Sequence, residues 1–133
     1  MKTIITRIKR RQEEDAIQAQ IFELLRVAAI DELIYFAVPN GGKRDWNTAK
    51  TLKDTGVMAG VLDIILIEPA RRIPHFMEVK TKRGSLSDDQ EDFIARLQHN
   101  GLPFAVVRSR DEAQDVLTAW GLLRVKTHLA SVA

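Results

Sequence analysis

One apolar stretch with a single carboxylate inside it constrains the fold more than any other part of the chain. Residues 61–67 read Val-Leu-Asp-Ile-Ile-Leu-Ile, and a strand that is apolar on both faces is usually covered on both sides of its sheet. A turn with the sequence Pro-Ala-Arg-Arg follows at residues 69–72. A second strand-like segment, 73–81, comes next. These segments predict an antiparallel hairpin.

The symmetry of this hairpin predicts which side chains face one another. If the turn is centred between Ala70 and Arg71, opposed residues have numbers that add up to about 141, which pairs Asp63 with Glu78. Lys80 lies two residues beyond Glu78 and therefore shares its face. A β-bulge would shift this register by one residue. Two carboxylates and one ammonium group are thus expected at one point.

Such a cluster needs a physical reason. Opposed carboxylates repel one another, and burying them adds a desolvation cost. A divalent cation removes both penalties, and carboxylate oxygens without nitrogen or sulfur ligands suit Mg²⁺ or Mn²⁺. The alternative is a structural cluster in which Lys80 neutralises Glu78.

Helices and strands alternate along the rest of the chain. Ile17 and Ile21 belong to an apolar stripe with helical spacing, and Ser87 with Gln90 forms a capping box that opens a later helix. The expected elements are helix 12–29, strand 33–38, helix 48–54, strands 61–68 and 73–81, helix 87–100, strand 103–108 and helix 111–120. This order predicts an α/β fold with a mixed central sheet flanked by helices.

Length and composition limit the possible functions. A chain of 133 residues predicts one domain, with a core over about 10–120, a basic N-terminal arm 1–11 and a C-terminal tail 121–133. The absence of cysteine excludes disulfides, thiolate metal sites and cysteine nucleophiles, and fits a cytoplasmic location. The net charge is only +2. A nucleic-acid surface therefore depends on where basic residues lie, with ordinary solvated surface as the alternative.

Several motifs together resemble a known family. They are Asp63, the Glu78-Val79-Lys80 triplet, the Asn40-Gly41-Gly42 loop and Gly84-x-Leu-Ser-x-x-Gln90. This set resembles the PD-(D/E)XK nuclease superfamily, and within it the small stand-alone phage or bacterial form of the VRR-NUC family, over residues 10–118. Leu62 stands where that family usually has proline. We expect the residue at this position to contribute only the shape of the backbone.

The resemblance implies a metal-dependent DNA endonuclease whose products carry 5′-phosphate and 3′-hydroxyl ends. Stand-alone members are similar to Holliday-junction resolvases, which favours a structure-selective homodimer acting on four-way DNA. Two alternatives stay open. One is a nuclease for flaps, nicked duplex or a specific site, and the other is a nucleic-acid-binding module without catalysis.

The same resemblance assigns roles to single residues. Asp63 and Glu78 are the main ligands of Mg²⁺ or Mn²⁺, and Lys80 orients or activates the attacking water. Glu14, which lies near the centre of the apolar stripe, is preferred to Glu13 as a third carboxylate, because its spacing to Gln18 resembles the Glu-x-x-x-Gln spacing of family members. The alternative for Glu14 is a solvated residue in the first turn of its helix.

Other assignments are less specific. Gln90 is either a capping residue or an active-site residue near Lys80, and both roles can coexist. The apolar tail segments 122–125 and 129–132 offer a surface for a dimer, and so does Leu33–Val38 if it is an edge strand. The alternative for the tail is packing on its own subunit. The expected DNA-contacting residues are Asn40, Gly41, Lys43, Arg44, Lys82, Arg83 and Gln18.

Overall fold

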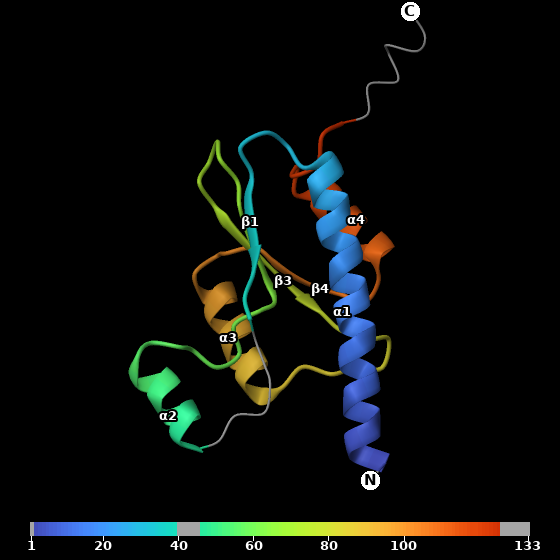
Figure 1. Cartoon of the computed structure of the whole chain (residues 1–133). Coiled ribbons are helices and arrows are strands. Elements are labelled where there is room, and N and C mark those ends of the chain that lie inside the picture. The colour runs from blue at the N-terminus through green and yellow to red at the C-terminus, as the bar shows by residue number, and fades with distance from the viewer. Residues whose placement is uncertain (1, 40–45, 126–133) are drawn as a thin grey trace, which may run out of the picture. The chain divides into compact units, whose positions relative to one another are not determined.

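The computed structural model describes residues 2–39 and 46–125 (Figure 1). Contacts divide the chain into two compact units. The first unit contains 1–33, 79–82 and 107–133, and the second contains 34–78 and 83–106. Each unit is therefore built from segments that are far apart in the sequence.

A four-stranded sheet has the strand order β1-β2-β3-β4. Its strands are β1 (Ile34–Ala37), β2 (Ile64–Ile67), β3 (Pro74–Val79) and β4 (Phe104–Val107). The pairs β1–β2 and β2–β3 are antiparallel. The N–H of Phe76 donates to Pro103 O and that of Lys80 to Val107 O, and residue numbers that rise together in this way make β4 parallel to β3. The sheet is therefore mixed, and the predicted α/β fold class is confirmed.

The hairpin has the register that the sequence predicts. Ile64 is paired with Met77, Ile65 with Phe76, Leu66 with His75 and Ile67 with Pro74. Asp63 and Glu78 occupy the next position of this register. β2 begins at Ile64, three residues later than predicted, because the N–H of Asp63 donates to the side chain of Glu78 instead of to a partner strand.

Two buried polar side chains stabilise the turn of the hairpin. The carboxylate of Glu68 accepts the N–H of Ala70 at 2.9 Å and that of Arg71 at 2.6 Å. The hydrogen bond from Arg71 N–H is the main reason why the pKa of Glu68 is lowered. His75 is 4% exposed, and this burial lowers the pKa of its imidazole. The folded hairpin therefore favours the charged form of Glu68 and the neutral form of His75.

In the second unit, helix α3 (Asp88–His99) packs on one face of the sheet. The rings of Phe93 and Phe76 meet edge to face with centroids 5.6 Å apart. Leu62 is fully buried in a cluster with Ile94 and Leu97 of this helix. The expectation that Leu62 contributes backbone shape alone is therefore wrong, because its side chain packs under α3. Helix α2 (Trp46–Asp54) also belongs to this unit.

In the first unit, helix α1 (Lys2–Ala28) packs against helix α4 (Arg110–Ala119) (Figure 1). The buried residues Ile21, Leu25 and Leu117 belong to these helices. Leu122 is fully buried, and its carbonyl accepts the N–H of Ile30. This part of the predicted tail therefore packs within its own chain, while residues 126–133 lie outside the described ranges.

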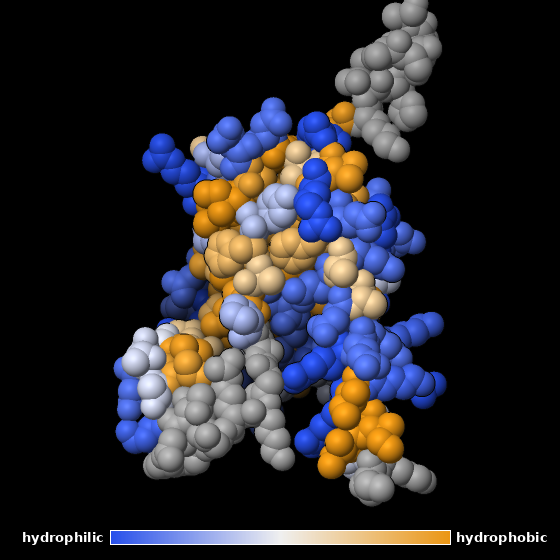
Figure 2. All heavy atoms as spheres, in the orientation of Figure 1, coloured by the Kyte–Doolittle hydropathy of each residue, from blue (hydrophilic) through white to orange (hydrophobic). Residues whose placement is uncertain are grey.

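The start of α1 differs most from the sequence prediction. The helix begins at Lys2 instead of residue 12, so the predicted basic arm is its first three turns. Those turns contain no glycine or proline, and five of the ten residues 2–11 are lysine or arginine, which favour helix. They bury no apolar stripe, since Ile4, Ile5 and Ile8 are exposed at the N-terminal end of α1 (Figure 2). A prediction based on apolar periodicity therefore missed them.

Two smaller points complete the fold. Ser109 caps α4 by accepting the N–H of Glu112, whereas the Glu112 carboxylate accepts the N–H of Arg108 and not that of Ser109. Among the helices in the described ranges, none combines the length and apolar character that a membrane span requires.

The buried imidazole predicts a pH dependence of stability. Because the pKa of His75 in the folded protein lies below its ordinary value of 6.5, protonation favours the unfolded chain. Stability should therefore be complete above about pH 6.5 and should decrease as the pH falls below it. Urea unfolding at about pH 7.5 and about pH 5.5 measures this loss. His75→Gln should reduce it, whereas His99→Gln, which changes an exposed histidine, should not. Equal pH dependence in both variants would contradict the assignment.

Candidate active site

Three predicted site residues come together in the second unit. Glu78 is 2% exposed, and its oxygen Oε1 accepts the backbone N–H of Asp63 at 3.2 Å. Its other oxygen, Oε2, accepts the side-chain N–H of Gln90 at 2.8 Å. Each carboxylate oxygen thus accepts a hydrogen bond from one of these two donors. The side chain of Asp63 is half-buried. The backbone N–H of the same residue orients Glu78.

The amide of Gln90 is held in one orientation by the helix that it opens. Its Oε1 accepts the N–H of Ser87 at 3.0 Å, while Ser87 Oγ accepts the N–H of Gln90 at 3.1 Å. This reciprocal pair is the predicted capping box at the start of α3. With its oxygen bound to Ser87, the amide directs Nε2 to Glu78. Gln90 therefore caps the helix and contacts Glu78 with the same group.

The packing of α3 explains why the two groups meet. Phe76 and Glu78 are two residues apart on β3 and share one face of the strand. Gln90 and Phe93 are three residues apart on α3 and share one side of the helix. The contact between Phe76 and Phe93 therefore sets the helix on the strand in the position that brings Gln90 to Glu78.

Lys80 belongs to the first unit and is half-buried. Its backbone N–H donates to Val107 O at 3.0 Å. The carbonyl of the next residue, Thr81, accepts a hydrogen bond from Arg108 Nη1 at 2.6 Å. Arg108 thus holds the segment that follows β3. No sequence motif marks it, because this contact depends on the pairing of two strands that are far apart in the chain.

The remaining predicted residues are distributed as follows. Glu14 and Gln18 lie on α1 in the first unit and are half-buried, whereas Glu13 is exposed. This exposure favours Glu14 over Glu13 as the residue with a role. Lys82 and Arg83 are exposed. Four predicted DNA-contacting residues lie outside the described residues: Asn40, Gly41, Lys43 and Arg44.

The donor set at Asp63 and Glu78 suits a hard cation. Among the described residues, no group of three or more histidine, cysteine, aspartate or glutamate side chains is arranged to hold a metal ion. Mg²⁺, however, is commonly bound by one or two carboxylates together with water and substrate phosphate. His75 lies on the opposite face of β3 from Glu78, so it adds no nitrogen ligand on that side. Asp63 and Glu78 themselves offer only carboxylate oxygens. Asp63 and Glu78 therefore fit Mg²⁺ or Mn²⁺.

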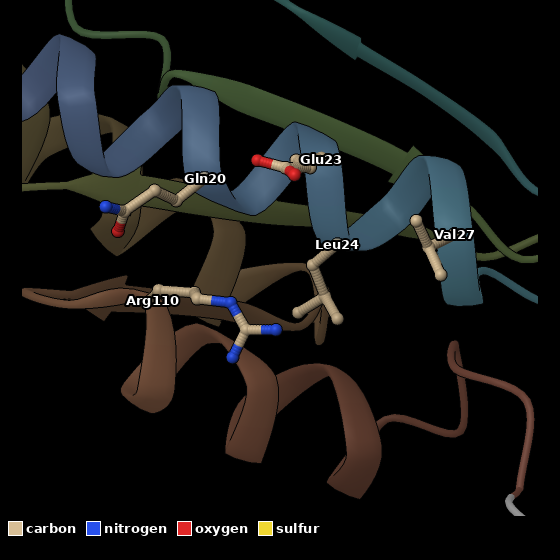
Figure 3. A pocket seen from close by; sticks show the side chains of 5 residues that line it. All are labelled: Gln20, Glu23, Leu24, Val27 and Arg110. Atoms are coloured by element: carbon tan, nitrogen blue, oxygen red, sulfur yellow. The ribbon is translucent and has the colours of Figure 1, made fainter.

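A separate pocket of about 340 Å³ lies in the first unit (Figure 3). Leu24 and Val27 supply its apolar wall, and Glu23 and Arg110 supply opposite charges. Gln20 completes the lining. None of the predicted site residues lines this pocket.

Comparison with known proteins identifies the family. The model of the VRR-NUC domain matches residues 6–111. The chain belongs to the VRR-NUC domain family. This is a family of nuclease domains, for which DNA is the implied substrate. None of the curated proteins is similar enough to the chain to count as a match.

Two solved structures share the fold of this VRR-NUC domain. One, a "VRR_NUC domain protein", has a TM-score of 0.62 and 20% identity, with 79% of this chain and 84% of that chain covered. The other, a "VRR_NUC domain", has a TM-score of 0.56 and 17% identity, with 81% and 97% covered. Identities at this level establish a common fold.

The double contact of Gln90 predicts the effect of one substitution. Gln90→Glu keeps an oxygen acceptor for Ser87 N–H but replaces the donor to Glu78 by a second negative charge. Without metal at neutral pH, the variant should lose about 1–3 kcal/mol of stability, since a buried acceptor loses its partner. Mn²⁺ should restore part of this loss by neutralising the two carboxylates. Denaturant unfolding with and without Mn²⁺ measures both effects.

The control is Gln98→Glu, which makes the same change at an exposed position of α3. It should show little loss and no recovery with Mn²⁺. If Gln90→Glu lost the same stability with and without Mn²⁺, metal binding beside Glu78 would be contradicted.

Proposed function

We propose that this VRR-NUC domain is a metal-dependent DNA endonuclease whose active centre is formed around Asp63 and Glu78. The observation that carries the proposal is the buried carboxylate of Glu78, which Asp63 N–H and Gln90 hold by one oxygen each. Burial of a carboxylate carries a desolvation cost that a structural role alone does not explain. In a nuclease domain the buried carboxylate has a use, because phosphodiester hydrolysis requires charge stabilisation at phosphate.

The residues have complementary roles in this proposal. Asp63 and Glu78 would hold Mg²⁺ or Mn²⁺, which supplies a water of lowered pKa and stabilises negative charge on the phosphate. Lys80 orients the attacking water and adds positive charge opposite the developing oxyanion. Gln90 keeps the Glu78 carboxylate in one orientation. Glu14, half-buried on α1, is the proposed third carboxylate.

We further propose that the enzyme is structure-selective and acts as a homodimer on four-way DNA. Resolution of a junction needs two symmetric cuts, which a two-fold dimer provides. Support for a dimer surface comes from β1, which is at the edge of the sheet. Ile34 and Phe36 on this strand are 55% and 43% exposed, and an apolar edge strand without a charged residue is normally covered by another chain or segment.

Removal of either carboxylate should separate cleavage from DNA binding. Asp63→Asn and Glu78→Gln should each lower the cleavage rate by roughly a thousandfold, because several kcal/mol of charge stabilisation are lost. DNA binding should be kept or strengthened, since a negative charge near phosphate is removed. Lys80→Ala should lose rate while it still binds metal. Labelled duplex, flap, nicked and four-way substrates with Mg²⁺ or Mn²⁺ measure the rate and the preferred structure.

Three outcomes would revise the proposal. Calorimetric titration with Mn²⁺ that shows no binding, with or without DNA, would remove the metal site. Binding of all substrates without cleavage would favour a non-catalytic nucleic-acid-binding module. Cleavage of flaps, nicked duplex or one specific site in preference to four-way DNA would keep the nuclease and replace the junction as its substrate.

The exposed basic pair after β3 should contact the DNA backbone. Lys82→Ala together with Arg83→Ala should weaken binding and lower the log–log salt slope by about 0.9 for each lost phosphate contact. The double variant Arg71→Ala with Arg72→Ala is the control, because it removes two charges from the hairpin turn, at the far end of β3 from Glu78. The predicted loop residues Lys43 and Arg44 are tested in the same way. An unchanged slope would place the substituted pair away from DNA.

The proposed dimer should depend on the β1 edge. Light scattering at tens of micromolar should give twice the 15.0 kDa of one chain, and Phe36→Glu should give the mass of a monomer with a weaker preference for four-way DNA. Val57→Glu is the matched control, since Val57 is 53% exposed outside any strand. A wild-type monomer that cuts duplex and four-way DNA equally would exclude the junction and leave a general nuclease.

A further inference from the structure

The loop that leads to Asp63 touches the first turn of α3 at an unusual place. A side-chain carbon added at Gly60 would lie 2.2 Å from the carbonyl oxygen of Asp89 and 2.4 Å from its carbonyl carbon. It would also lie 2.8 Å from the backbone nitrogen of Gln90. All three atoms belong to one peptide group of the helix backbone. None of them can turn aside as the end of a flexible side chain can.

That peptide group is part of the capping box. The backbone nitrogen of Gln90 donates to Ser87 Oγ, and the side chain of the same residue donates to Glu78 Oε2 at 2.8 Å. A displacement of the Asp89–Gln90 peptide therefore moves the group that orients Glu78. Two residues beyond Gly60, Leu62 is buried against Ile94 and Leu97, so the loop cannot simply swing away from α3.

We propose that Gly60 is a positioning residue of the active centre: the absence of a side chain lets α3 approach closely enough for Gln90 to orient the Glu78 carboxylate. This inference rests on the proposed function for its catalytic consequence. The contact itself concerns only the second unit. Gly60 has a φ of +85°, which also favours glycine, so the test must separate this backbone conformation from the close approach.

The chain contains a matched control for that separation. Gly56 has a φ of +100°, and a side-chain carbon added there would have no atom within 4 Å. Gly56→Ala therefore carries the conformational cost without the contact. Gly60→Ala carries both. Gly60→Asn is a second variant, because asparagine tolerates a positive φ better than alanine does.

The experiment is a double-mutant cycle between Gly60→Ala and Gln90→Ala, with three measurements on the full chain. Gly60→Ala should weaken Mn²⁺ binding and lower the cleavage rate by about 10–100-fold, the usual range for loss of a group that orients a metal ligand. Gly56→Ala should change neither by more than about twofold. In the Gln90→Ala background, Gly60→Ala should cause no further loss of Mn²⁺ affinity or rate, because the group that it displaces is already absent.

The third measurement is the stability of the four metal-free proteins, which needs no catalysis. The loss of stability caused by Gly60→Ala should be smaller in the Gln90→Ala background than in the wild type. If the wild type cleaves no DNA, the proposed function fails while this stability cycle still decides the contact.

Three results would overturn the positioning role. They are equal losses of Mn²⁺ affinity for the Gly60 and Gly56 variants, full additivity with Gln90→Ala in the cycle, and a chain that folds with neither Ala nor Asn at position 60. The last result would assign Gly60 to folding instead of to the site.

Discussion

The burial of the Glu78 carboxylate is the constraint on which the rest of the site depends. A carboxylate that is 2% exposed needs donors from nearby groups, because an unpaired buried charge costs far more than the protein's net stability margin can absorb. Asp63 N–H and the Gln90 amide supply two such donors. The first delays the start of β2 to Ile64, and the second requires the start of α3 to lie against β3. One charge thus shapes both its neighbouring strand and its neighbouring helix.

The boundary between the two compact units lies directly after Glu78. The chain passes from the second unit to the first between Glu78 and Val79, and it passes again between Val106 and Val107. Strands β3 and β4 therefore each contribute residues to both units. The main-chain bond from Lys80 to Val107 and the contact of Arg108 with Thr81 fix the residues just beyond that point within the first unit.

Local patterns allowed much of the fold to be predicted from the sequence. The hairpin register follows from a symmetric turn, and the start of α3 follows from Ser87 and Gln90, since both depend on residues close together in the chain. The start of α1 was missed because its first turns bury nothing, so only helix propensity marks them. The packing of Leu62 and the contact of Arg108 join distant segments, and no local pattern records such contacts. The catalytic roles of Asp63, Glu78, Lys80, Glu14 and Gln90 stay predictions.

The shared duty of Gln90 has a consequence for how this domain can change over evolutionary time. One amide both initiates a helix and orients the Glu78 carboxylate, so a mutation there affects folding and the site in the same event. Selection on this position therefore cannot exchange stability for activity, as it can where separate residues carry the two tasks. A mutation that removes the Gln90 amide should therefore remove part of the α3 capping box together with the contact to Glu78.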